Sequence, residues 1–129
     1  MGRIVQRVKI RSLINQAESV EVDALVDTGA SIMALPSKYK AIFKSTELFE
    51  AESVTASGPM PVKIGAGFLV QIAEFRPTSA DIAFIDGLDE PLISYTLLEA
   101  IPVAVDMLGH RLVPVKYLHM KQLYGKIAF

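Results

Sequence analysis

Cysteine and tryptophan are both absent from this chain of 129 residues. Without cysteine there is no disulfide, no thiolate metal site and no cysteine nucleophile. Histidine is scarce as well, since only His110 and His119 occur, so a histidine-rich metal site is excluded and no metal or cofactor is expected. An excess of one charge is also missing: 13 Lys and Arg residues stand against 14 Asp and Glu residues, a formal net charge of -1. That balance argues against a nucleic-acid partner or a polybasic membrane binder.

Long apolar runs are missing too. No run approaches the roughly 18 residues needed to cross a bilayer, and the charged segment 3–11 lacks the apolar stretch of a secretory signal. We therefore expect no membrane partner and a cytoplasmic location, for which the missing cysteine is weak added support. The basic residues between Arg3 and Arg11 are predicted to form the solvated face of a strand rather than a nucleic-acid patch.

Apolar residues, by contrast, are abundant, at 51% of the chain. This composition excludes a disordered chain. The length predicts one domain over residues 1–129. Because a domain of this size has much surface and little interior, the apolar excess predicts that part of its surface faces another subunit.

Alternation of apolar and polar residues dominates the first half of the chain and predicts β-structure. Two alternating segments around a polar turn at 15–18 indicate an N-terminal hairpin. Ser94 can N-cap a short helix, and another short helix fits within 37–48. The predicted fold class is therefore all-β, one domain with one or two short helices. The expected strands cover 4–11, 20–26, 54–56, 62–75, 82–85, 103–105 and 111–113.

The second predicted strand runs directly into the segment 24–31, with the sequence ALVDTGAS. An apolar strand delivers one carboxylate, Asp27, at its end, and a tight turn with a hydroxyl and a glycine follows. Gly29 lets another backbone approach closely, and the Thr28 hydroxyl can donate or accept across a symmetry axis. The alternative is a strand that ends in an ordinary Asx turn, because Asp-Thr-Gly alone is only moderately specific. The flanking apolar residues and the trailing Ala-Ser favour a catalytic interpretation.

The segment 25–31, LVDTGAS, resembles the active-site loop of the retropepsin-like aspartic proteases, including their microbial single-lobe members. A Gly-Pro turn lies about thirty residues downstream, where that family has its flap hairpin. The segment 91–100 resembles the family's second motif, two apolar residues and a glycine before a short helix, and 106–114 resembles the closing strands of microbial members. The resemblance spans most of the chain and implies a retropepsin-like barrel with one lobe per chain.

Three positions depart from the family's pattern. Ser94 stands where the second motif usually has glycine, so its Cβ is expected to crowd the strand crossing behind Asp27. Viral members place Arg after that glycine and Asp at the end of the loop, where this chain has Tyr95 and Ser31. Both partners of their Asp–Arg ion pair are therefore absent, which predicts that other interactions support the loop here. We call such a support the brace of the loop. Arg111 is one candidate for it, although a role elsewhere is favoured.

One Asp-Thr-Gly per chain supplies half of an aspartic protease site. Such an enzyme needs two carboxylates, one protonated and one ionised, that share a water. A two-fold axis supplies the second Asp27 from an identical chain, and the resemblance likewise implies a homodimer. The expected function is an aspartic endopeptidase that hydrolyses peptide bonds in peptides or proteins. The alternative is a non-catalytic dimeric peptide-binding module on the same fold.

The roles of the loop residues follow from this chemistry and from the resemblance. Asp27 of each chain is the general acid and base. The resemblance implies that Thr28 bridges the two loops, that Gly29 admits the substrate backbone, and that Ala30 and Ser31 line the cleft.

A flap that covers the substrate is expected in a hairpin downstream of the loop. The alternative flap tip is 64–67, which holds two glycines. The tail 115–129 mixes apolar residues with lysines and is assigned to no element from its pattern, and the resemblance implies a strand used in the dimer. The predicted flap residues are Ser57, Gly58, Pro59 and Met60.

Overall fold

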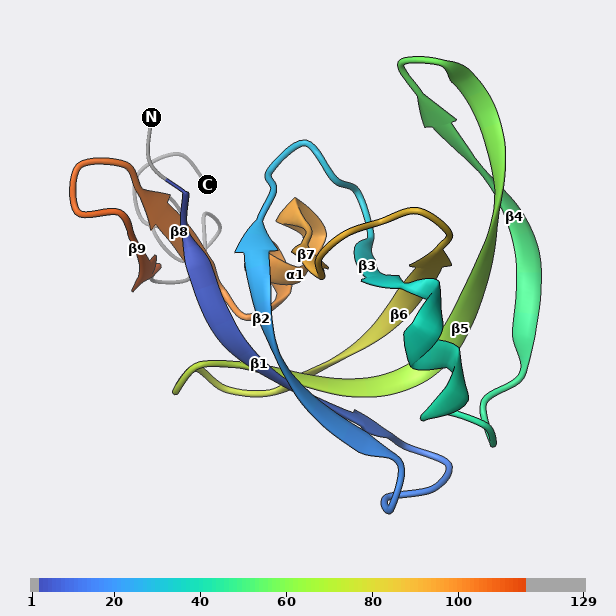
Figure 1. Cartoon of the computed structure of the whole chain (residues 1–129). Helices are drawn as coiled ribbons and strands as arrows, with labels where there is room; N and C mark the ends of the chain where they lie inside the picture. Colours follow the sequence, from blue (N-terminus) through green and yellow to red (C-terminus); the bar gives the residue numbers. More distant parts are fainter. Residues whose placement is uncertain (1–2, 116–129) are drawn as a thin grey trace, which may run out of the picture.

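The computed structural model describes residues 3–115, which form nine β-strands, one 3-10 helix and one short α-helix (Figure 1). The prediction of a mainly-β domain with short helices is confirmed. None of the helices in residues 3–115 combines the length and the apolar character needed to cross a membrane. In chain order the elements are β1 (Val5–Ser12), β2 (Ser19–Val26), β3 (Met33–Pro36), η1 (Ser37–Ala41), β4 (Leu48–Thr55), β5 (Gly58–Ile72), β6 (Thr78–Ile85), β7 (Leu92–Ile93), α1 (Tyr95–Ala100), β8 (Val103–Asp106) and β9 (Arg111–Pro114).

Six of the strands close into a mixed barrel. Its hydrogen-bonded order is β1-β2-β7-β3-β6-β5, and pairing of β5 with β1 closes the ring. Two neighbouring pairs are parallel, β2 with β7 and β3 with β6, and the others are antiparallel. β4 adds to β5 outside the ring, and β8 and β9 form a separate two-stranded sheet.

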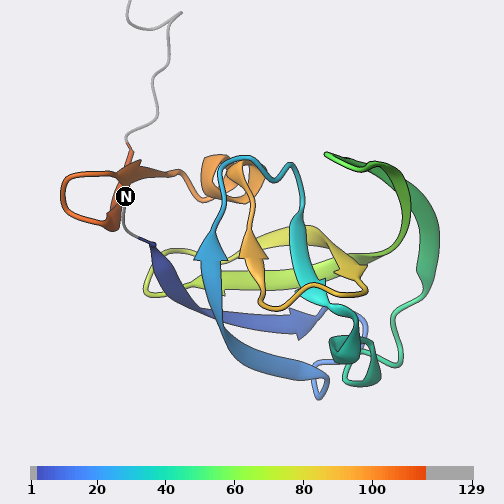
Figure 2. The same cartoon turned by 45° about the horizontal axis from the view of Figure 1, so that its top comes forward.

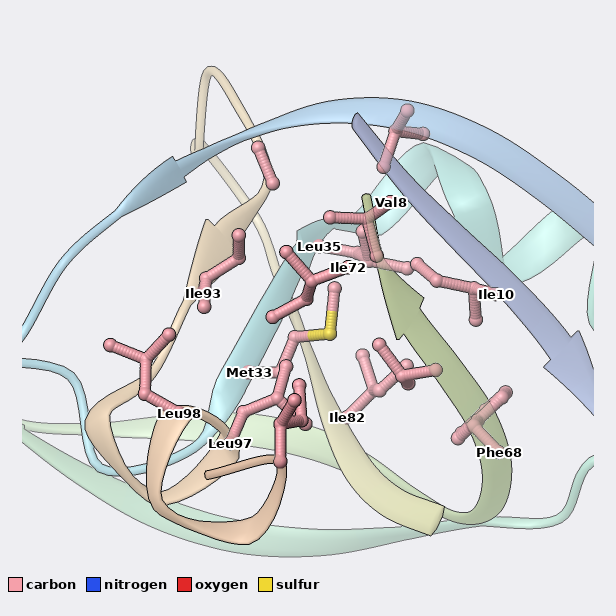
Figure 3. Packing of buried hydrophobic residues seen from close by; sticks show 14 of the residues in the cluster. Val8, Ile10, Met33, Leu35, Phe68, Ile72, Ile82, Ile93, Leu97 and Leu98 are labelled. Carbon is pink, nitrogen blue, oxygen red and sulfur yellow. The ribbon is translucent and has the colours of Figure 1, made fainter. Parts of the chain in front are cut away.

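The barrel interior is built by the period-two pattern of the strands. In β1, the even-numbered residues Val8 and Ile10 are buried, whereas the odd-numbered basic residues are exposed, as the sequence predicted. Figure 3 shows the buried side chains of β1, β3, β5, β6, β7 and α1 converging on one core. Its aromatic part is a cluster of Phe43, Phe68 and Phe84, whose ring centroids lie 5.1 to 6.4 Å apart.

β5 is the longest strand and pairs with three others, β1, β4 and β6. It bends at a register shift between Gly65 and Phe68. A Cβ on Gly65 would lie 3.0 Å from the side chains of Leu48, Phe68 and Thr46, so glycine is needed for this close approach. The segment 64–67, the alternative flap tip, therefore lies at a bulge inside a strand and not at a hairpin turn.

The predicted short helices and the last hairpin are present. Ser94 is the N-cap of α1, because its Oγ accepts a hydrogen bond from the backbone N–H of Leu97 at 3.3 Å. The helix expected within 37–48 is η1, a 3-10 helix of five residues. The hairpin expected after Pro102 is β8–β9. His119 and the tail beyond Val115, for which a dimer strand is predicted, lie outside the described residues.

Candidate active site

Asp27 lies at the point where β2 leaves the barrel, at the start of a loop of residues 27–32 that leads to β3. We call this segment the Asp27 loop. Its first residue is held by the neighbouring strand, since the backbone N–H of Asp27 donates to the carbonyl oxygen of Ile93 at 2.9 Å. Strand β7 thus fixes the place where the carboxylate emerges.

A local turn then orients the carboxylate. The backbone N–H of Gly29 donates to Asp27 Oδ1 at 3.0 Å, and the N–H of Ala30 donates to the Asp27 carbonyl oxygen at 3.0 Å. A Cβ on Gly29 would lie 3.2 Å from Oδ1, so glycine at this position leaves room for the carboxylate. Within residues 3–115, the second oxygen Oδ2 has no hydrogen-bond partner, and Asp27 itself is half-buried. The loop therefore presents one carboxylate oxygen, at a fixed place, for another group to bind.

The expected crowding behind the loop is not found. Ser94 is fully buried in an ordinary extended conformation, with φ of -85° and ψ of 162°, so its side chain is accommodated. Two residues further on, the Thr96 hydroxyl donates to the carbonyl oxygen of Ser31 at 2.8 Å. The N–H of Tyr95 donates to the carbonyl oxygen of Ala30 at 3.1 Å. The connection from β7 to α1 is thus the brace of the Asp27 loop.

Arg111, the sequence-based candidate for the brace, lies in the β8–β9 hairpin and forms an ion pair with Asp106 at 3.1 Å. The backbone N–H of Gly109 and then the Arg111 side chain hold the pKa of Asp106 below its ordinary value. His110 is exposed in the same turn, with φ of +52°. This cluster stabilises a turn and is separate from the Asp27 loop.

The predicted flap residues lie at the tip of a hairpin formed by β4 and β5. Thr55 pairs with Gly58 across a two-residue turn, so Ser57 is in the turn and Gly58, Pro59 and Met60 begin β5. Gly58 has φ of +106°, a conformation that favours glycine. Figures 1 and 2 show the hairpin rising beyond the barrel at the end that carries the Asp27 loop and curving toward that loop. The structure therefore brings both predicted segments to one end of the molecule.

An apolar row beside Asp27 was missed by the sequence analysis. Val5 of β1 and Leu92 of β7 flank Leu25 of β2 in the strand register, and Leu25 shares one face of β2 with Asp27 two residues later. Val5 is 46% exposed, and Leu25 and Leu92 are half-buried. The spacing of Leu25 from Asp27 was visible in the sequence, but the register of its neighbours was not.

Two ion pairs border this row. Arg3 Nη2 contacts both carboxylate oxygens of Glu90, at 2.6 and 2.8 Å, and Arg7 contacts Asp23 at 3.2 Å. These side chains are solvent-exposed, so the pairs contribute little to stability. They do place charged groups at the margins of the row and leave its centre apolar.

No group of three or more His, Cys, Asp or Glu side chains suited to a metal ion occurs in residues 3–115. No protein-family model matches the chain, and no curated protein matches it. The function must therefore be inferred from the Asp27 loop and the surfaces around it.

Proposed function

We propose that this protein is a retropepsin-like aspartic endopeptidase whose active site is completed in a homodimer. One observation carries the proposal. Asp27 is anchored by a barrel strand and oriented by the Gly29 N–H, and no group among residues 3–115 hydrogen-bonds its Oδ2, so this oxygen is available to a second copy. A loop that served only as a turn would not need the hydrogen bonds that the start of α1 makes to the Asp27 loop.

The fold supports this proposal. In the mixed barrel, β7 lies between β2 and β3, so the loop that joins β2 to β3 crosses the end of β7 and carries Asp27 at the rim. The order of the motifs along the chain and the position of the β4–β5 hairpin agree with the resemblance found in the sequence. A barrel of this kind offers one carboxylate per chain at a surface that a two-fold axis can duplicate.

The chemistry needs both copies of Asp27. Two carboxylates in contact share one negative charge, so one is protonated and the other ionised. The ionised carboxylate takes a proton from a water held between them, and that water attacks the peptide carbonyl carbon. The protonated carboxylate donates its proton to the carbonyl oxygen. As the C–N bond breaks, the carboxyl group that took the proton from water gives it to the amine nitrogen, and a hydroxyl of the tetrahedral intermediate returns a proton to the other carboxylate.

The surrounding residues take roles that their positions allow. Thr28 is exposed beside Asp27, which suits a hydroxyl that hydrogen-bonds across the dimer axis. The row of Val5, Leu25 and Leu92 suits an apolar substrate side chain next to the scissile bond. The β4–β5 hairpin closes over the peptide and excludes water from the two carboxylates.

Exposed apolar side chains near the site support a second subunit. Val54, next to the hairpin tip, is 85% exposed, and Tyr95, directly behind the Asp27 loop, is 42% exposed. Burial of such side chains against a partner is favourable by roughly 25 cal/mol per Å² of apolar surface. We expect the proposed dimer, which joins the two Asp27 loops, to bury exposed apolar side chains of this kind.

The test is peptide cleavage by the purified chain and by Asp27→Asn. The wild type is expected to cleave peptides from a diverse library at mildly acidic to neutral pH and to be blocked by a transition-state inhibitor of aspartic proteases. Asp27→Asn is expected to lose about a thousandfold in kcat or more, because an amide cannot exchange the proton. Asp106→Asn, in the β8–β9 turn, is the matched control and is expected to keep its activity.

Sedimentation of the same samples separates the alternatives. The proposal expects a dimer for the wild type and for Asp27→Asn, with peptide binding kept in both. A wild type that binds peptides but never cleaves them would be the non-catalytic binding module instead. A monomer with full peptidase activity would contradict the shared site.

A further inference from the structure

The brace behind the Asp27 loop consists of uncharged groups. Ser94 Oγ lies 3.0 Å from Thr96 Oγ1, and Thr96 Oγ1 lies 2.8 Å from the carbonyl oxygen of Ser31. On its other side, Ser94 Oγ lies 3.3 Å from the backbone nitrogen of Leu97. Two hydroxyl groups thus connect the first turn of α1 to the end of the Asp27 loop.

The direction of each hydrogen bond among these hydroxyl groups follows from counting the available protons. A hydroxyl carries one proton, and the Thr96 hydroxyl gives its proton to the Ser31 carbonyl, which can only accept. The contact between the two hydroxyls must therefore be donated by Ser94. Ser94 in turn accepts from the Leu97 N–H, so all the bonds point the same way, from Leu97 to Ser31. Bonds aligned in this way polarise one another and strengthen the chain.

The two hydroxyl groups hold the Asp27 loop together with two backbone hydrogen bonds. Tyr95 N–H holds the Ala30 carbonyl, and Ala30 N–H holds the Asp27 carbonyl. The carbonyl of Ser31 is thereby fixed by Thr96 at one end of the loop, while Asp27 is fixed by Ile93 at the other. A loop that is tied at both ends keeps the Asp27 carboxylate in one position relative to the barrel.

We propose that Ser94 and Thr96 are positioning residues for Asp27, forming a directional hydroxyl chain in place of a charged brace. The inference rests on the proposed function, because it assigns a purpose to the position of Asp27. Ser94 is fully buried, and its hydroxyl would be costly there without these partners. Since the hydroxyl chain of Ser94 and Thr96 contains no charged group, ionic strength leaves its hydrogen bonds unaffected, unlike those of an exposed ion pair.

The experiment compares Thr96→Val, which keeps the side-chain shape and removes the hydroxyl, with Thr96→Ser, which keeps the hydroxyl. Thr46→Val is the matched control, because the Thr46 hydroxyl is buried and has no hydrogen-bond partner in the described part of the chain. Amide hydrogen exchange is measured at Ala30 and Tyr95, and kcat and KM are measured on a peptide that the wild type cleaves.

Thr96→Val is expected to speed exchange of the Ala30 and Tyr95 amides about tenfold, the effect of losing one hydrogen bond. Its kcat is expected to fall about tenfold with KM changed less than about twofold, because the carboxylate is displaced while the cleft remains. Thr96→Ser is expected to stay within about twofold of the wild type in both measurements, and so is Thr46→Val. Raising the salt concentration from about 0.05 to 0.5 M is expected to leave the wild-type exchange rates unchanged.

Two results would overturn the inference: wild-type exchange in Thr96→Val, or equal impairment of Thr96→Ser and Thr96→Val. If Thr96→Val does not fold, Thr96→Ala replaces it, because Thr96 is exposed and its truncation leaves no cavity in the core. If the wild type cleaves no peptide, the proposed function fails, and the exchange rates at Ala30 and Tyr95 still decide whether the hydroxyl chain holds the loop.

Discussion

The Asp27 loop and the β4–β5 hairpin lie at the same end of the molecule but are supported in different ways. The loop is tied to two other elements: β7 holds Asp27, and the start of α1 holds Ala30 and Ser31. The hairpin is held together by its own ladder, from Leu48 opposite Gly65 to Thr55 opposite Gly58, as it extends beyond the barrel. The groups that the proposed mechanism needs to hold in place are thus on the braced segment, whereas the hairpin that it needs to open is held mainly by its own ladder.

The sequence explains this difference. β2 and β3 flank the loop with buried residues such as Ala24 and Met33, so both of its ends are anchored in the core. β4 exposes Glu50, Glu52 and Val54 instead. An apolar side chain as exposed as Val54 contributes little to the stability of the folded monomer.

The largest effect is expected from a change at the braced loop. Gly29→Ala places a Cβ 3.2 Å from Asp27 Oδ1, so the carboxylate must shift by a few tenths of an ångström. We expect kcat to fall about a hundredfold, because catalysis depends steeply on alignment. Initial-rate kinetics would show this loss with a melting temperature within about 2 °C of the wild type. A kcat close to the wild-type value would mean that the position of the carboxylate is less critical than proposed.

A smaller effect is expected at the hairpin. Gly58→Ala forces a side chain into φ of +106°, which costs about 1–2 kcal/mol of backbone strain. We expect KM to rise about fivefold with little change in kcat, because in the proposed enzyme the hairpin contacts the substrate while the carboxylates stay in place. Gly87→Ala, with φ of +80° in the β6–β7 turn, is the matched control and should lower the melting temperature without changing KM.

Association is expected to depend on the hairpin as well. Val54→Asp adds a charge to an exposed apolar side chain and should leave the stability of the folded monomer unchanged, yet raise the dimer dissociation constant about tenfold. Analytical ultracentrifugation measures that constant. Leu108→Ser is the comparison, because Leu108 is 98% exposed on the β8–β9 hairpin at the far side of the molecule. An equal effect of the two substitutions would place the interface elsewhere.

The smallest effect is expected far from Asp27, at the β1–β2 turn. Hydrogen bonds from the Ser45 side chain and backbone, and then from Asn15, hold the pKa of Glu18 below its ordinary value. Because the pKa of Glu18 is lower in the folded state, its ionised form stabilises the fold at pH values above the ordinary pKa of a glutamate. This contribution is lost as the pH falls through the lowered pKa. Glu18→Gln should lower the melting temperature by about 1–2 °C at neutral pH. The difference from the wild type should vanish in acid, and kcat should not change at any pH.

Much of the fold could be predicted from the sequence because its signals are local. Alternation in 4–11 and 20–26 predicted β1 and β2, the Ser94 cap predicted α1, and the Gly-Pro pair predicted the hairpin turn. The partners of Asp27 could not be predicted, because they depend on which strands lie side by side. The parallel placement of Leu92 beside Leu25 is an example, since it joins residues from opposite ends of the domain.

The position of Ser94 illustrates the same limit. Because the resembled family usually has glycine at this position, the Cβ of Ser94 was expected to crowd the strand crossing behind Asp27. Whether a Cβ fits depends on the backbone conformation and on the partners of the hydroxyl group. Here φ of -85° is comfortable for any side chain, and the hydroxyl caps a helix and supports Thr96. A residue that departs from the resembled family's pattern can therefore supply a different set of hydrogen bonds for the same loop.

The insertion of β7 between β2 and β3 also determines when the site can form. The Asp27 loop is made early in the chain, but Ile93, Tyr95 and Thr96, which hold it, come more than sixty residues later. Contacts between such distant residues carry an entropy cost, because a long loop of chain must close before they form. A growing or shortened chain that ends before Ile93 contains Asp27 without its supports, so the carboxylate takes its position only when the domain is nearly complete.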